Sequence, residues 1–187
     1  MNNKYSFKDL LYTKIEIDFD NQTKVDFSKI EIPMIQRDYA QGRKVEFKLN
    51  ETGKRFIDTV FSSFKKGHLM EMDFVYGSVS ENLKEHTFTP LDGQQRLTTL
   101  FLLYWYVGSR ELKEEQYSDL MISLDKFTYS TRSSSRRFCK LLCETKLSFD
   151  KLPSTEIKNL FWFFKSYEKD PTIKAMLNML DAIHERY

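Results

Sequence analysis

The stretch Thr89–Leu100 constrains the fold of this chain most, because it passes from an extended segment through a tight turn into an apolar helix. Asp92 is a favourable N-cap residue, and Gln95 three positions later completes a capping-box pattern. We therefore expect the helix to begin near Gly93. A helix start presents unpaired N–H groups and the positive end of the helix dipole. The stretch predicts an ordinary capped core helix or, with Arg96 one turn in, an anion site.

The chain before this stretch has the alternating pattern of strands and hairpins, interrupted by helical periodicity. We expect a mostly hairpin-built mixed sheet with packing helices. The predicted elements are a short capped helix after Ser6, a hairpin over residues 15–27 with its turn at 20–23, an extended piece at 30–33, a helix over 52–66 ended by Gly67, and a second hairpin from strands 72–79 and 87–91.

The chain after Gly108 has a different character, with helical spacing and no strand pattern. The last helix carries no stop signal after Ile183, so we expect the chain to continue into a longer native protein. The predicted fold is α+β, with a core over residues 1–107 followed by an all-helical segment over residues 108–187. The helices expected in that segment span residues 111–124, 134–144, 155–167 and 171–186.

The composition excludes several classes of protein. A net charge of +2 does not fit a broadly basic nucleic-acid binder, so any contact with a polyanion must be local. No apolar run approaches the roughly 18 residues of a membrane span, and we expect a soluble, cytoplasmic protein. Cys139 and Cys143 share a helix face and are expected to be buried thiols rather than a disulfide. Zinc-ligand spacing, the His-Asn-His nuclease pattern and the phosphate-binding P-loop motif are all missing from the sequence.

Two further polar stretches offer groups that hold phosphate. Residues 34–43 contain Gln36, Arg37, Tyr39 and Arg43, which supply an amide, two guanidinium groups and an aromatic face. Residues 129–139 place three arginines and several hydroxyls at a helix start. The alternatives are a solvated polar loop for the first stretch and a flexible serine loop that caps a helix for the second.

The first polar stretch and the opening stretch together resemble a known family. Residues 32–39 and, some fifty residues later, residues 91–100 are similar to the paired signatures of the ParB-like N-terminal domain of GmrSD-type modification-dependent restriction proteins, which act in phage defence. Either signature alone is weak, but the pair in this order is specific. The resemblance covers roughly residues 10–107, and the 129–139 stretch and the helix after Asp170 resemble a subset of the family.

The resemblance implies a core related to ParB and sulfiredoxin, with nucleotide at the start of the helix that follows a strand and turn. It implies that the domain binds, and in several members hydrolyses, a nucleoside triphosphate, and that this activity controls DNA cleavage. Full-length members continue into a C-terminal His-Asn-His nuclease domain. Where many members carry a tryptophan after the motif tyrosine, this chain has Gln41. The residues that map onto the nucleotide motifs are Gln36, Arg37, Tyr39, Asp92, Gly93, Gln94, Gln95 and Arg96, followed by Thr98.

The chemistry of phosphoryl transfer assigns roles to these residues. The site must neutralise charge, position the phosphates and orient a water molecule. Arg96 and Arg37 are candidates for neutralising charge, the backbone of residues 93–95 for cradling phosphate, and Gln94 or Asp92 for orienting water. Mg²⁺ is expected to arrive with the nucleotide and to use Asp92. The expected catalytic residues are Asp92, Gln94, Arg96 and Arg37, and Arg136 is added to the nucleotide contacts.

The leading hypothesis is a nucleoside-triphosphate-binding, hydrolysing regulatory domain of a restriction protein. Its expected partners are nucleotide, DNA through the full-length protein, and a C-terminal nuclease domain or subunit, with oligomerisation left open. A ParB-like nuclease ranks below it because no acidic metal cluster is evident. The main alternative is a non-catalytic module that reads modified DNA through Arg37, Arg43, Arg132, Arg136 and Arg137.

Overall fold

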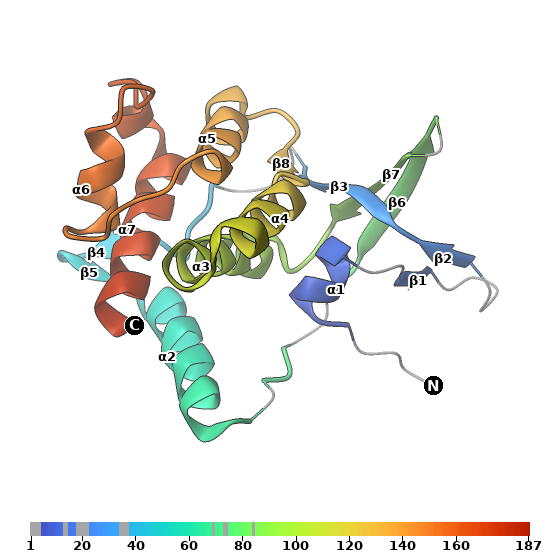
Figure 1. Ribbon diagram of the computed structural model, residues 1–187, viewed down its shortest axis with the longest axis horizontal. Coiled ribbons are helices and arrows are strands. Elements are labelled where there is room, and N and C mark those ends of the chain that lie inside the picture. Colours follow the sequence, from blue (N-terminus) through green and yellow to red (C-terminus); the bar gives the residue numbers. More distant parts are fainter. Residues whose placement is uncertain are drawn as a thin grey trace.

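The structure is a computed structural model that describes residues 5–12, 15–17, 23–33, 38–68, 70–72, 75–83 and 85–187. Its strands gather on one side of the molecule and most of its helices on the other (Figure 1). The helices are α1 (Phe7–Tyr12), α2 (Glu51–Lys66), α3 (Gln94–Glu111), α4 (Glu114–Leu124), α5 (Ser133–Cys143), α6 (Pro153–Lys158), the 3-10 turn η1 (Tyr167–Lys169) and α7 (Pro171–Arg186). The strands are β1 (Ile15–Ile17), β2 (Thr23–Val25), β3 (Phe27–Ile32), β4 (Lys44–Val45), β5 (Lys48–Leu49), β6 (Gly77–Asn82), β7 (Glu85–Pro90) and β8 (Phe127–Tyr129).

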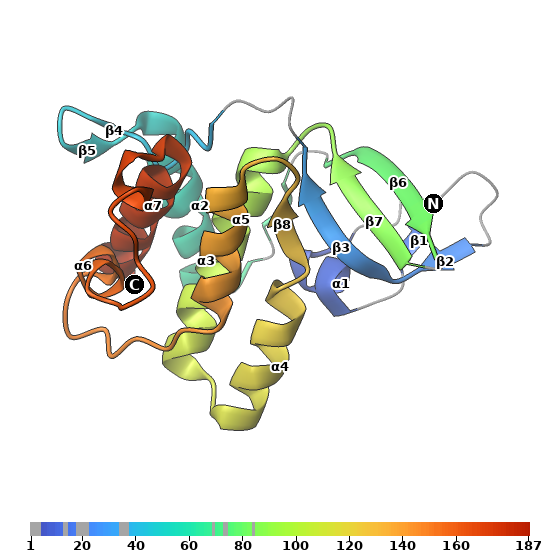
Figure 2. The same ribbon diagram turned by 90° about the horizontal axis from the view of Figure 1, so that it is seen from above.

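The main sheet is small and mixed, as predicted, with strand order β6-β7-β3-β8. β6 and β7 form the expected antiparallel hairpin, although β6 begins at Gly77 rather than at residue 72. β3 runs parallel to both of its neighbours, so that Ile30 lies between Phe88 of β7 and Phe127 of β8. Figure 2 shows these strands side by side, with β8 next to α5. The predicted hairpin of β1 and β2 is present, with Ile15 opposite Val25, but its second strand is Thr23–Val25 rather than residues 25–27, because Phe27 begins β3. Most of its turn lies outside the described residues.

The prediction that everything after residue 107 is helical is wrong at one element. Residues 127–129 form β8, which pairs with the edge of β3. The strand is held at both ends, because Ile30 N–H donates to Lys126 O at 2.8 Å and Ser130 N–H donates to Ile32 O at 2.9 Å. The second half of the chain therefore completes the sheet of the first half.

Helix α3 forms the centre of the structure. The Phe101 ring stacks on Phe127 of β8 at 4.8 Å between centroids. On another side, the Tyr104 ring meets Phe7 of α1 edge to face at 5.1 Å. Trp105 is fully buried, and its indole N–H donates to the Leu142 carbonyl of α5 at 2.7 Å. α7 packs along α3 as well (Figure 1), so elements from both halves of the chain share one core.

Local capping explains why several helices begin and end where the sequence predicts. In α1, Ser6 and Asp9 cap each other reciprocally, with Ser6 N–H donating to Asp9 at 2.7 Å. In α2, Asn50 accepts from Gly53 N–H at 2.9 Å, and Gly67 ends the helix at φ 64°. In α7, Asp170 accepts from the N–H groups of Thr172 and Ile173.

The helix predicted over residues 155–167 is wrong in its second half. α6 ends at Lys158, and turns lead from there to η1. The turns allow the Trp162 ring to meet Phe138 of α5 at 5.9 Å and its indole N–H to donate to Thr145 Oγ1 at 3.1 Å. Packing of one tryptophan thus overrides helical periodicity here. Among the helices that the structure describes, none has the length and apolarity to cross a bilayer.

The close approach of residue 42 to α7 gives a first prediction. A Cβ on Gly42 would lie 1.9 Å from the backbone oxygen of Ala175, so Gly42→Ala must push the loop off the helix. We expect a loss of about 3 kcal/mol or more in the free energy of unfolding, measured by urea denaturation. The control is Gly67→Ala, where φ is 64° but the space is open; it should cost about 1 kcal/mol. Equal losses for the two variants would contradict this account.

The two cysteines give a second prediction. Both are free and buried as expected, and burial raises the pKa of the Cys139 thiol above its ordinary value of 9.0 and that of Cys143 well above it. The unfolded chain releases these protons first, so the folded state should lose stability as the pH rises through about 9. Between about pH 8 and pH 9.5, urea denaturation should show a loss of about 1–2 kcal/mol from the thiols. A Cys139→Ala/Cys143→Ala variant should lack this loss of stability. An identical decline in that variant would show that groups other than the thiols cause it.

Candidate functional site

The turn before α3 differs from the predicted cap. The N-cap residue is Gly93 at φ 83°, not Asp92, and a Cβ at Gly93 would lie 2.6 Å from Val75 Cγ2. Both the backbone conformation and the space therefore require glycine. The Asp92 carboxylate instead pairs with Arg96 of the next turn at 3.2 Å. The Asp92 side chain is 58 % exposed and the Arg96 side chain 17 %, so the carboxylate is the more open group.

Gln94 and Thr98 face inward and join α3 to the sheet. The Gln94 amide donates to Pro90 O of β7 at 2.6 Å. The Thr98 hydroxyl lies 3.0 Å from the Tyr129 hydroxyl of β8. Burial raises the pKa of Tyr129 well above its ordinary value, which keeps this hydroxyl protonated. Both side chains are buried, and their contacts fix the position of α3 relative to the sheet.

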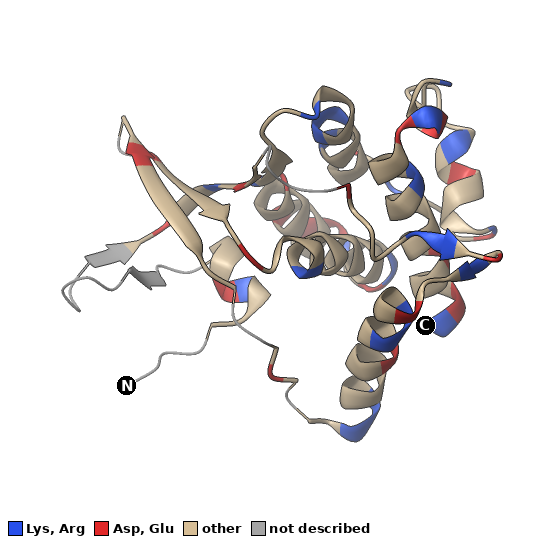
Figure 3. Ribbon diagram, turned by 180° about the vertical axis from the view of Figure 1, so that it is seen from behind, with Lys and Arg blue, Asp and Glu red and all other residues tan. Residues whose placement is uncertain are grey.

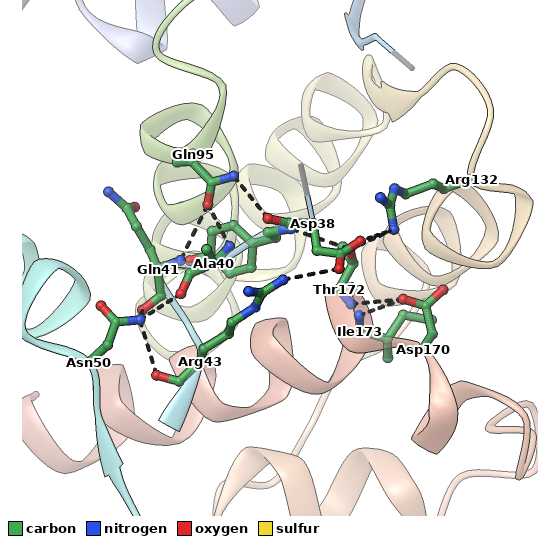
Figure 4. A network of polar contacts seen from close by, with 11 residues as sticks. Asp38, Ala40, Gln41, Arg43, Asn50, Gln95, Arg132, Asp170, Thr172 and Ile173 are labelled. Carbon is green, nitrogen blue, oxygen red and sulfur yellow. Dashed lines mark hydrogen bonds and ion pairs between the residues drawn. The ribbon is translucent and has the colours of Figure 1, made fainter. Parts of the chain in front are cut away.

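Gln95 does not complete a capping box either; it binds the loop of residues 38–43. Its Oε1 accepts from the N–H groups of Ala40 at 2.6 Å and Gln41 at 3.3 Å, and its Nε2 donates to Asp38 O at 3.3 Å. Figure 4 shows this amide reaching from α3 to the loop backbone. One side chain thus connects the two stretches that the sequence singles out, which lie about 55 residues apart.

Tyr39 and Gln41 point into the core from the same loop. Tyr39 is 2 % exposed, and its hydroxyl lies 2.7 Å from Thr99 Oγ1 of α3. The Thr99 hydroxyl also lies 2.5 Å from Gln41 Oε1. Burial raises the pKa of Tyr39, so the phenol stays neutral. The aromatic face of Tyr39, predicted from the sequence as a group for a ligand, is turned into the core instead.

Asp38 forms the centre of the charged part of the site. Its two carboxylate oxygens pair with Arg43 at 3.0 Å and with Arg132, the residue before α5, at 2.5 Å. Arg132 also donates to Thr172 Oγ1 in the first turn of α7 at 3.3 Å, and Thr172 accepts from Tyr39 N–H. Figure 4 shows Asp38 between the two guanidinium groups. A carboxylate is therefore held between two cations beside the starts of α5 and α7.

Arg136 and Asn50 fix the edges of this region. Arg136 donates to the Tyr129 carbonyl at 2.8 Å and to the Ser130 carbonyl, so it binds the end of β8. The Asn50 side-chain amide donates to three loop carbonyls, those of Ala40, Gln41 and Arg43. The same Asn50 side chain caps α2. The loop is thereby fastened to α2, α3 and α7.

The structure brings most of the predicted site residues together and adds others. Gln36 and Arg37 lie outside the described residues. The turn and the start of α3 contain Asp92, Gly93, Gln94, Gln95, Arg96 and Thr98. The side chains of Tyr39, Gln95 and Arg136 bind other parts of the chain. Sequence reasoning missed three residues, Asp38, Asn50 and Thr172. Asp38 lies inside the first signature, and Asn50 is a favoured N-cap residue just before the predicted helix, but nothing local marks Thr172.

A cleft of about 660 Å³ lies elsewhere, lined from α2 and the end of α7 by residues such as Asp58, Ser62, Lys66 and Arg186. None of its lining residues belongs to the two signatures. Within the described ranges, no group of three or more His, Cys, Asp or Glu side chains is placed to hold a metal ion.

The amide of Gln95 gives the third prediction. In Gln95→Ala the N–H groups of Ala40 and Gln41 lose their acceptor, so the free energy of unfolding should fall by about 1–3 kcal/mol in urea denaturation. Gln116→Ala, an exposed glutamine on α4, is the matched control and should stay within about 0.5 kcal/mol of the original chain. A Gln95→Ala variant as stable as this control would show that the contact does not hold the loop.

Searches of the curated proteins and of the solved structures found no significant match. A family model described as the N-terminal domain of GmrSD restriction endonuclease matches residues 15–186, which include the sheet, the loop of residues 38–43 and every helix from α2 to α7. The expected family is thereby confirmed over almost the whole length. This chain belongs to the family of N-terminal domains of GmrSD restriction endonucleases.

Proposed function

We propose that this chain is the nucleoside-triphosphate-binding, hydrolysing regulatory domain of a phage-defence restriction protein, with its site between the start of α3 and the loop of residues 38–43. The observation that carries the proposal is the contact of Gln95 with the backbone of Asp38, Ala40 and Gln41. This contact joins the two family signatures into one surface. Residues that belong to one site are expected to meet in this way, although they lie far apart in sequence.

The charges around this surface suit phosphate. The start of α3 is the positive end of an 18-residue helix, and its N-cap Gly93 has no side chain to hydrogen-bond the first-turn N–H groups. Arg96 lies one turn further on. Arg43 and Arg132 pair with the carboxylate of Asp38 and would have to release it to bind phosphate, so the proposal depends on Arg96 and the start of α3. Phosphate oxygens accept from guanidinium groups in the same bidentate manner as a carboxylate does.

The hydrolysis step assigns distinct roles to Asp92 and Gln94. A water oxygen bonds to the γ-phosphorus as the bond from that phosphorus to the bridging oxygen breaks, which leaves a nucleoside diphosphate and phosphate. In the proposal the exposed Asp92 carboxylate orients that water and accepts its proton, or contacts Mg²⁺ that the nucleotide carries. Gln94 is buried against Pro90 and serves to shape the turn. Arg96 and Arg37 neutralise the charge that develops on the phosphates.

Other residues position the site in this proposal. Tyr39, Gln95 and Thr98 hold the loop, the helix and the sheet in register, and Arg136 holds the end of β8. The proposal also includes the finer expectations from the resemblance: a relation to ParB and sulfiredoxin, a nuclease domain or subunit as partner, DNA reached through the full-length protein, and a cytoplasmic location.

The alternative, a DNA-binding groove lined by arginines, has less support from the contacts. Arg43 and Arg132 pair with Asp38, Arg136 binds the carbonyls of Tyr129 and Ser130, and Arg137 lies over the Phe164 ring at 5.3 Å. Each of these guanidinium groups already has a partner within the chain. A phosphate backbone would therefore have to displace these contacts.

The fourth prediction tests the nucleotide site by thermal shift. The ligands are adenine and guanine nucleoside triphosphates, each tested with and without Mg²⁺. We expect at least one of them to raise the Tm by about 5–10 °C at 100 times its Kd. Arg96→Ala should weaken that binding at least tenfold, because one charge-assisted phosphate contact is lost. The Mg²⁺-dependent release of phosphate should fall in parallel.

The matched control is Arg55→Ala, which removes an exposed arginine from α2, outside both signatures. It should leave nucleotide affinity unchanged. Binding that Arg96→Ala does not alter would contradict the site, and a Tm that no triphosphate shifts would overturn the proposal. Binding without phosphate release would retain the binding function and remove hydrolysis.

A further inference from the structure

The hairpin of β4 and β5 turns through two residues whose backbone is unusual. Val45 pairs with Lys48, so Glu46 and Phe47 alone form the loop. Both have positive φ, 49° and 68°. A two-residue hairpin loop with positive φ at both positions is the type I′ turn, which favours Asn and Gly. Phenylalanine is among the residues least suited to this conformation.

The Phe47 side chain is not buried, so packing does not offset the strain of its backbone. It is 96 % exposed at the tip of the hairpin, and the neighbouring Val45 is exposed as well. A bulky side chain in the left-handed region costs free energy that burial normally offsets. Since no burial offsets it here, the position of the ring points to a contact outside the chain.

The surroundings of Phe47 are basic. Lys48 directly follows the loop and Lys44 precedes Val45 on the other strand, and both lysines are exposed. Arg43 precedes β4, and Lys54 and Arg55 lie in the first turns of α2, which begins two residues after β5. Figure 3 shows basic residues along both strands of the hairpin and an acidic residue at its tip. Arg43 is paired with Asp38, and between residues 44 and 55 four basic side chains stand against two acidic ones, so the element attracts anions.

The base of the hairpin is firmly held, so the ring is presented from a fixed position. Asn50 N–H donates to Arg43 O at 2.9 Å, which closes the hairpin below its two short strands. Asn178 of α7 donates to Gly42 O at 3.2 Å. A group held in this manner loses little conformational entropy when it binds a partner.

We propose that the β4–β5 hairpin contacts duplex DNA, with the Phe47 ring inserted at a base step and Lys44 and Lys48 on the flanking phosphates. Apolar wedges such as phenylalanine enter base steps from basic elements, and aromatic rings stack on every base. A protein partner suits this element less, because the cores of protein interfaces are depleted in charged residues. The contact does not depend on the proposed nucleotide site.

The fifth prediction uses the 187-residue chain and a mixed-sequence duplex of about 25 base pairs, with affinity measured by fluorescence anisotropy across a salt series. Phe47→Asn should weaken binding at least about fivefold without altering the salt slope, because it removes stacking and no charge. Lys44→Gln/Lys48→Gln should lower the slope by about two, because two phosphate contacts are lost. Fluorescence of 2-aminopurine in the duplex should rise with the original chain and not with Phe47→Asn.

The chain offers a matched control. Phe161 is also 96 % exposed but lies after α6, so Phe161→Asn should bind as the original chain does. Asn tolerates positive φ, so Phe47→Asn should keep or raise the Tm, which separates loss of the contact from loss of the fold. Equal affinity for the Phe47→Asn and Phe161→Asn variants would overturn the proposal. A chain that does not bind the duplex at low salt would overturn it too.

Discussion

The burial of α3 on almost every side is the constraint on which the rest of the structure depends. Twelve of its eighteen residues are buried, among them side chains on opposite faces such as Phe101 and Leu103. A helix that is covered all round needs partners in every direction. The sheet, α1, α5 and α7 each supply one face, and each comes from a different part of the chain. The candidate site lies at the start of this helix.

Local signals in the sequence identified most of the elements. The helix after Ser6 and the helix that ends at Gly67 were predicted from neighbouring residues, and each begins or ends as predicted. The two signatures were expected to form one site, and Gln95 joins them. In each case the physical cause lies within a few residues or within a motif.

What the sequence did not reveal depends on contacts between distant residues. Three residues, Phe127–Tyr129, show no useful periodicity, and they form a strand only because β3 offers an open edge. Nothing near Tyr39 shows that its hydroxyl meets Thr99 in the core. Asp92 has the chemistry of a cap, but the tight space beside Val75 places Gly93 at that position. The roles of Asp38 and Thr172 depend on Arg132, almost one hundred residues from Asp38.

The pairing of β8 with β3 also has a consequence for synthesis on the ribosome. β3 ends at Ile32, and the strand that covers its edge follows roughly 95 residues later. At about 5–20 residues per second, the nascent chain carries an open strand edge for about 5–20 s. Open edges recruit other strands. The order of residues along the chain therefore makes nascent copies of this protein prone to association before β8 has emerged.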